Sequence, residues 1–142
     1  MSLLTQSYFS GASDEAIIDQ TIGNFLDEIC QRYPDNEALV VRHQSIRWTY
    51  REFKQEIDQL ATGLLALGIE PGDRVGIWGP NSAEWVLAQY ATASIGAIMV
   101  CLNPAYRLHE LEYALNKVEC RGIITAESFK TSHYLQMLEV LA

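Results

Sequence analysis

The sequence predicts an α/β domain whose parallel βαβαβ sheet is flanked by helices and preceded by a helix and a short β-hairpin. Short apolar runs begin at Arg74, Ala97 and Gly122, and apolar residues recur at helical spacing after each run. Glycine and proline residues stand between the two kinds of pattern. Strands that alternate with helices of this length are typical of a parallel sheet with right-handed crossovers.

The first twenty residues carry no periodic pattern, so we expect a loose lead-in over 1–20 and the folded region over 21–142. A helix is predicted to open at Thr21, because apolar residues follow at helical spacing and Pro34 comes after the last of them. Two β-prone runs, 38–42 and 45–48, predict a hairpin. His43 and Gln44 would form its two-residue turn, without the glycine that favours such turns.

Thr49-Tyr50-Arg51-Glu52 has the form of a capping box and predicts the start of a second helix. The helix would end at Gly68, a residue that tolerates the left-handed conformation common at helix ends. Pro71-Gly72 then predicts a turn before the first parallel strand.

The alternating region is expected to contain three strands and three helices. Its predicted strands are 74–78, 97–102 and 122–125. Asn81 or Ser82 would cap the first of the helices, which ends near Ser94. Apolar residues at helical spacing mark the two later helices: Leu108, Leu111, Leu115 and Val118 in one, and Tyr134, Leu135 and Leu138 in the other.

Residues 85–105 carry no charge and are long enough to be read as a membrane span. Polar residues interrupt this stretch and Gly96 breaks it, so we interpret it as a buried helix followed by a buried strand. Cys101 lies in the apolar run and is expected to be a small buried hydrophobic residue.

Composition narrows the functional classes. A net charge of -8 disfavours nucleic acid, which is itself a polyanion. The three cysteines contain no CxxC pair and predict neither a disulfide framework nor a zinc site. They favour a reducing, cytoplasmic location, and residues 1–11 lack the basic and apolar regions of a signal peptide.

The stretch GIWGPNS, 76–82, invites comparison with phosphate-binding loops. It has no Gly-Lys-Ser/Thr ending and no G-x-G-x-x-G spacing, so we interpret it as a turn that ends a strand and caps a helix. His43, His109 and His133 lie far apart in the chain and predict no metal site.

The loops that follow the predicted strands are better candidates for binding, because ligands of parallel sheets lie beyond the carboxyl ends of the strands. Two of these loops, LNPAYR and TAESFK, contain a cation, Arg107 and Lys130 respectively. A cation close to each predicted strand end hints at an anion site there.

Three stretches of the chain together resemble the N-terminal part of the AMP-forming acyl-CoA synthetases, within the adenylate-forming superfamily. They are YPDNEALV, WTYREF and the run from LGIEPGDRVGIWGPNS to LNPAYRLHELEYAL. The resemblance covers about 21–138. It implies that a medium- or long-chain fatty acid attacks Mg-ATP to give an acyl-adenylate and pyrophosphate, and that coenzyme A (CoA) then displaces AMP. It also implies that the fold is part of a larger adenylate-forming N-terminal domain.

The same resemblance places the family's ATP loop, magnesium ligand and catalytic lysine beyond Ala142, so no catalytic residue is carried onto this chain. We therefore expect an inactive fragment that associates with itself and binds no cofactor alone. The family's site for the nucleotide end of CoA falls near Ala105, Tyr106 and Lys130. The family has arginine close to the position of Lys130, so this lysine is a departure from the pattern.

Two other readings stay open at this point. One is a free-standing, non-catalytic α/β module that binds a small molecule. The other is a signalling receiver domain, which would need paired acidic residues after the first parallel strand; the run Arg74 to Trp78 is followed by none.

Overall fold

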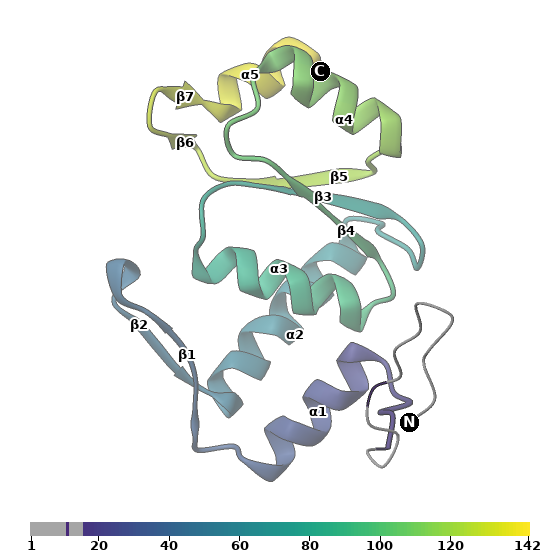
Figure 1. Ribbon diagram of the computed structural model, residues 1–142, viewed down its shortest axis with the longest axis vertical. Helices are drawn as coiled ribbons and strands as arrows, with labels where there is room; N and C mark the ends of the chain where they lie inside the picture. Colours follow the sequence, from purple (N-terminus) through teal and green to yellow (C-terminus); the bar gives the residue numbers. More distant parts are fainter. Residues whose placement is uncertain (1–10, 12–15) are drawn as a thin grey trace, which may run out of the picture.

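A three-stranded parallel sheet stands at the centre of the described part of the chain. The computed structural model describes Gly11 and residues 16–142. Most of the expected lead-in, 1–20, lies outside the described residues, and 16–20 form no helix or strand. Helices lie on both faces of the sheet, and a separate β-hairpin extends beside the lower helices (Figure 1).

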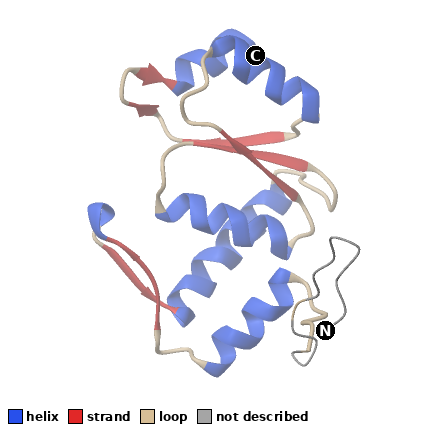
Figure 2. Ribbon diagram, viewed as in Figure 1, coloured by secondary structure: helices blue, strands red, loops and turns tan. Residues whose placement is uncertain are grey.

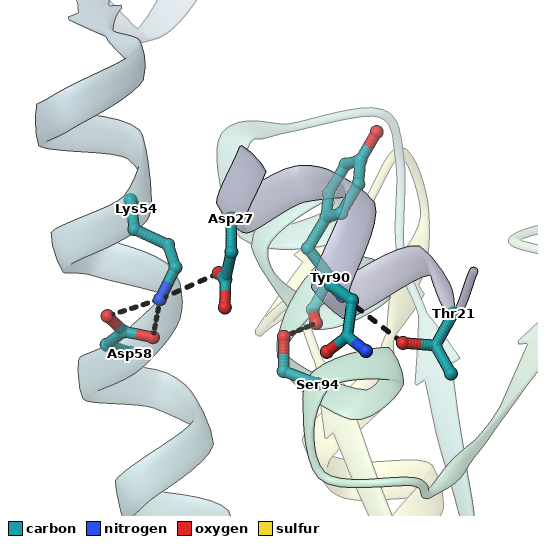
Figure 3. Close-up of polar contacts among 7 residues, drawn as sticks. Thr21, Asp27, Lys54, Asp58, Tyr90 and Ser94 are labelled. Carbon is teal, nitrogen blue, oxygen red and sulfur yellow. Dashed lines mark hydrogen bonds and ion pairs between the residues drawn. The ribbon is translucent and has the colours of Figure 1, made fainter. Parts of the chain in front are cut away.

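The first helix, α1 (Ile22–Arg32), begins where the sequence predicts. The Thr21 hydroxyl accepts a hydrogen bond from the Asn24 amide at 3.2 Å. Lys54 joins α1 to the next helix, because its ammonium lies 3.2 Å from Asp27 of α1 and 2.6 Å from Asp58 of its own helix (Figure 3). Ion pairs at the surface thus join α1 to the next helix, in addition to the apolar contacts between these two helices.

The predicted hairpin forms, but its turn is different. The strands are β1 (Glu37–Val41) and β2 (Ile46–Thr49), joined by a 3₁₀ turn, η1 (Arg42–Gln44), and by Ser45 at φ 56°. The two-residue turn at His43-Gln44 was therefore wrong. A tight two-residue turn requires positive φ angles, which cost histidine and glutamine more energy than glycine. A longer connection avoids that requirement.

The second helix, α2 (Tyr50–Ala66), has the predicted capping box. The Glu52 amide donates to the Thr49 hydroxyl, and the Thr49 amide donates to the Glu52 carboxylate at 2.8 Å. These bonds hold the pKa of Glu52 below its ordinary value. Beyond the helix, Gly68 adopts φ 82°, which confirms it as the residue that lets the chain turn away.

The parallel sheet has the order β4-β3-β5 and consists of β3 (Arg74–Trp78), β4 (Ile98–Leu102) and β5 (Gly122–Thr125). Two helices make the crossovers, α3 (Ala83–Ser94) and α4 (Leu108–Val118), and they lie on opposite faces of the sheet (Figure 2). Opposite faces are required because two crossovers of the same hand run in opposite directions across the sheet, first from β3 to β4 and then from β4 past β3 to β5. The prediction of a βαβαβ unit is confirmed.

A second, two-stranded hairpin follows β5. It consists of β6 (Ser128–Phe129) and β7 (Ser132–His133) and leads directly into α5 (Tyr134–Leu141). The sequence did not predict these strands, since two residues are too few to show a period.

The sheet separates two hydrophobic cores. One lies among α1, α2, α3 and one face of β3, and includes Phe53, Ile57 and Val75. The other lies beneath α4 and α5, and is built on Trp78, Leu102, Leu111 and Tyr134. Trp78 and Tyr134 are fully buried, so the carboxyl end of β3 is anchored in the second core.

The expectation of a buried strand over 97–102 was only partly correct. The α3 residues Leu87, Ala88 and Ala91 are buried, but Ile98 is 52% exposed and Cys101 is exposed. The reason is that β4 lies at the edge of the sheet, with a neighbouring strand on one side only. Across the described residues, no helix combines the length and the apolar character of a membrane span.

Candidate functional site

The stretch 76–82 turns a corner, as the sequence indicates. The Ser82 hydroxyl accepts from the Trp85 amide at 3.3 Å and caps α3. Gln44, from the turn of the first hairpin, accepts from the Ala83 amide at 2.7 Å and donates to the Glu84 carboxylate at 2.8 Å. That hydrogen bond is the main reason why the pKa of Glu84 lies below its ordinary value. A carboxylate therefore occupies the first turn of α3, where a phosphate would otherwise be attracted.

The loop after β4 is a tight turn organised by Asn103. Its backbone carbonyl accepts from the Trp78 indole N–H and from the Tyr106 amide, both at 3.0 Å. Its side-chain oxygen accepts from the Ala105 amide at 2.9 Å. The backbone of Ala105 and Tyr106 is thus fixed directly above the carboxyl end of β3 and β4.

The segment after β5 presents Lys130 at the tip of the second hairpin. Lys130 and Thr131 form the two-residue connection between β6 and β7. Lys130 has φ 54°, a left-handed conformation that favours glycine. Its ammonium lies 5.3 Å from the centre of the Phe129 ring. A long cationic side chain is therefore held at a position that the backbone alone would give to glycine.

Two hydrogen bonds tie these loops together. The Tyr134 hydroxyl, after the second hairpin, donates to the Pro104 carbonyl at 2.6 Å. The Arg107 guanidinium, after the β4 loop, donates to the Thr131 hydroxyl at 3.5 Å. Beneath them the rings of Trp78 and Tyr134 stack with centroids 3.8 Å apart, and burial raises the pKa of the Tyr134 phenol. The loops that carry Ala105, Tyr106 and Lys130 thus form one continuous surface.

Arg107 and Lys130 belong to the half of the chain's cations that form no ion pair among the described residues. Of the ten lysine and arginine residues, all within the described part, five form ion pairs with carboxylates: Arg32, Arg47, Arg51, Lys54 and Arg74. Neither Arg107 nor Lys130 forms one. The sequence showed both cations near strand ends, but could not show that Arg107 reaches the residue next to Lys130.

The remaining candidates carry no site. His43, His109 and His133 are exposed and lie on separate elements, as expected. Among the described residues, no cluster of three histidine, cysteine, aspartate or glutamate side chains could hold a metal ion. The surface formed by the loops after β4 and β5 is therefore the candidate binding site.

Comparison with known proteins identifies the family. The family model described as "AMP-binding enzyme" matches residues 26–141. The chain belongs to the AMP-binding enzyme family. It is 49% identical over 133 residues to a mouse protein named medium-chain acyl-CoA ligase ACSF2, mitochondrial, and 46% identical to the human protein of that name. A putative acyl-CoA synthetase of Bacillus subtilis, YngI, is 38% identical over 125 residues.

These matches cover 94% of this chain for the mouse protein and 88% for the bacterial one, but only 22% and 23% of those proteins. The chain therefore spans less than a quarter of the length of these relatives.

Solved structures have the same fold. The N-terminal domain of FACL13 from Mycobacterium tuberculosis superposes with a TM-score of 0.77, at 26% identity, over 85% of this chain and 29% of that one. The N-terminal subdomain of Klebsiella oxytoca NpsA superposes with a TM-score of 0.70, at 29% identity, over 78% of this chain and 27% of that one. The expected placement of the fold in an adenylate-forming N-terminal domain is thus confirmed.

Proposed function

We propose that the protein containing this chain is an AMP-forming fatty acid–CoA ligase. It would use Mg-ATP to convert a medium- or long-chain fatty acid into an acyl-adenylate, with release of pyrophosphate, and would then transfer the acyl group to CoA. The observation that supports this proposal is the match of 116 residues, 26–141, to the AMP-binding enzyme family, together with relatives that are named acyl-CoA ligases. The proposal concerns the longer protein, because those named relatives are more than four times the length that the chain matches.

The contribution of this segment would be part of the site for the nucleotide end of CoA. We place Ala105, Tyr106 and Lys130 there. The two loops are held together by the Tyr134–Pro104 hydrogen bond, and the Lys130 ammonium forms no ion pair that would compete with a ligand phosphate. The nucleotide end of CoA carries several phosphate charges, so a free cation at this surface attracts it.

The experiment is to measure the two half-reactions of the full-length enzyme with Lys130→Glu. Reversing the charge is expected to raise the KM for CoA about five- to thirty-fold, corresponding to roughly 1 to 2 kcal/mol, and less at high salt. Pyrophosphate exchange should not change, because adenylation precedes the arrival of CoA. Lys117→Glu serves as the matched control, since Lys117 lies in the last turn of α4, at the other end of that helix from the loop.

Two results would contradict the proposal. An unchanged KM for CoA would remove Lys130 from the site. A native protein with a mass near the 16.0 kDa of this chain would instead favour a free-standing binding module. The 142-residue chain by itself is expected to show no pyrophosphate exchange above a blank without enzyme.

The location of the protein is also a proposal. The free cysteines favour a reducing compartment, and the cytoplasmic location that we expect from them stays a prediction. The ACSF2 relatives are named as mitochondrial proteins, and a test by fractionation should therefore include mitochondria.

A further inference from the structure

A crevice lies where two neighbouring strands of the sheet send the chain to opposite faces. The chain leaves β3 toward α3 on one face, and leaves β5 toward the second hairpin and α5 on the other. The two strand ends stay together, because the Trp78 carbonyl accepts from the Thr125 hydroxyl at 2.9 Å and from the Ala126 amide at 3.2 Å. In open α/β sheets, a ligand commonly lies in the crevice that such diverging connections leave.

The first hairpin closes one side of this crevice. Its turn residue Gln44 binds both the Ala83 amide and the Glu84 carboxylate, so the hairpin tip lies beside the start of α3 (Figure 1). The resulting cavity has a volume of about 390 Å³ and is lined by 43–44, 77–82, 84–85 and 124–126. This volume is within the range of small-molecule sites. The residues assigned above to the CoA site do not line it.

The wall of the cavity formed by the first turn of α3 is acidic and aromatic. Glu84 and His43 are the ionisable side chains among the described residues that line it, and neither lysine nor arginine is among them. The hydrogen bond from Gln44 helps to hold the pKa of Glu84 below its ordinary value, so this carboxylate is charged at neutral pH. Trp85, the next residue, is half-buried and also lines the cavity.

This lining selects the charge of a ligand. A carboxylate or a phosphate is repelled by Glu84. An organic cation is attracted both by the carboxylate and by the face of an indole ring, which binds cations better than the other aromatic side chains do. The apolar part of the lining, which includes Ile77, Pro80 and Ile124, can cover the uncharged body of such a molecule.

We propose that the cavity between the first hairpin and the carboxyl ends of β3 and β5 binds a small organic cation, an ammonium or amidinium group carried on an apolar or aromatic body. Glu84 is the counter-ion, and Trp85 supplies the aromatic wall. Gln44 is a positioning residue that orients Glu84. This second ligand is distinct from the substrates of the proposed ligase, all of which are anions.

The test measures the preference of the protein for a cation among ligands of similar size. Benzylammonium is the probe, and benzyl alcohol and benzoate are its neutral and anionic counterparts. Each is titrated into the full-length protein and into the 142-residue chain, and binding is followed by saturation-transfer NMR. Benzylammonium is expected to bind about two- to fivefold more tightly than benzyl alcohol, as for one exposed charged contact, and benzoate should bind least.

Two variants test the assigned residues. Glu84→Gln keeps a side chain that can accept from Gln44 but removes the charge, so benzylammonium and benzyl alcohol should then bind equally. Trp85→Leu keeps an apolar side chain but removes the indole, and should reduce the preference. Glu112→Gln is the matched control, because Glu112 is an exposed carboxylate of α4, on the opposite face of the sheet, and should leave the preference unchanged. Thermal unfolding followed by circular dichroism shows whether each variant is folded.

The outcomes are distinct. Equal binding of benzylammonium and benzyl alcohol to the full-length protein overturns the inference, and so does a preference that survives in Glu84→Gln. Binding to the isolated chain but not to the full-length protein also overturns it, because the rest of the protein then fills the cavity. A preference that is lost in Glu84→Gln and kept in Glu112→Gln supports it. None of these measurements depends on acyl-CoA formation, so this inference and the proposed function can fail separately.

Discussion

Removing one hydroxyl group tests whether the Tyr134–Pro104 hydrogen bond holds the two loops together. Tyr134→Phe keeps the ring that stacks on Trp78 and deletes only the donor, which lies 2.6 Å from the Pro104 carbonyl. Tyr134 is fully buried, but Pro104 is partly exposed, so water can reach the freed carbonyl. We therefore expect the free energy of unfolding to fall by about 1 kcal/mol, near the middle of the range for such bonds.

The assay is thermal or urea unfolding of the 142-residue chain at low protein concentration. For a chain of this length, 1 kcal/mol lowers the melting temperature by roughly 2 to 4 °C. Tyr113→Phe is the matched control, because Tyr113 is 65% exposed and its hydroxyl makes no hydrogen bond within the described residues. A melting temperature that falls equally in both variants would refute the reasoning.

The pH dependence provides a second signature. Burial raises the pKa of Tyr134 above that of a tyrosine in the unfolded chain, which is about 10. The neutral phenol therefore contributes stability below pH 10, and this contribution is lost as the pH rises through the folded-state pKa. Tyr134→Phe has no phenol to ionise, so the difference in the free energy of unfolding between wild type and variant should become smaller above pH 10. A constant gap would show that the phenol titrates alike in both states.

Three further predictions concern other parts of the chain. Gln44→Ala should lower the free energy of unfolding at pH 7 by about 1 kcal/mol, because it removes the hydrogen bonds to Glu84 and Ala83. This loss should shrink as the pH falls through the lowered pKa of Glu84, and unfolding curves of wild type and variant at pH 7 and pH 3.5 measure the difference. A thiol reagent at pH 8 should label Cys101 first, because it is exposed, while burial raises the pKa of Cys30 and Cys120; equal rates for all three, or a fast phase that survives in Cys101→Ser, would contradict this. The isolated chain should associate with itself through the exposed edge of β4, and light scattering that shows only monomer at tens of micromolar (a working range for weak interfaces) would count against it.

Local signals in the sequence were sufficient for most of the fold. The capping box at Thr49 and Glu52 is confirmed because its partners are three residues apart and depend on nothing distant. The strand over Arg74–Trp78 is confirmed because its apolar run is continuous and ends at Gly79-Pro80, and α3 is confirmed because Ser82 caps it. In α4 the apolar residues recur at helical spacing. The α/β class follows from the alternation of these strand and helix signals.

Features that depend on distant parts of the chain were missed. Cys101 lies in a run as apolar as that of a central strand, but the order of the strands places it at an edge, and order is not a local property. The second hairpin has strands of two residues each, too short for any period to appear. The contact between Arg107 and Thr131 depends on how both loops meet, so no local pattern in the sequence could show it.

The position of β3 between two cores has a consequence for synthesis on the ribosome. The central strand is made before either of its neighbours, and the core on the α3 side draws on residues from Leu26 to Ala97, with Ile124 as its one late contributor. That half of the molecule can therefore close while later residues are still being added. The layer of α4 and α5 can form only afterwards, around a Trp78 side chain that is already in place and still open to water. Until Tyr134 emerges to cover this indole, the nascent chain exposes a large aromatic surface, and this interval is when it is most open to capture by chaperones or by a neighbouring chain.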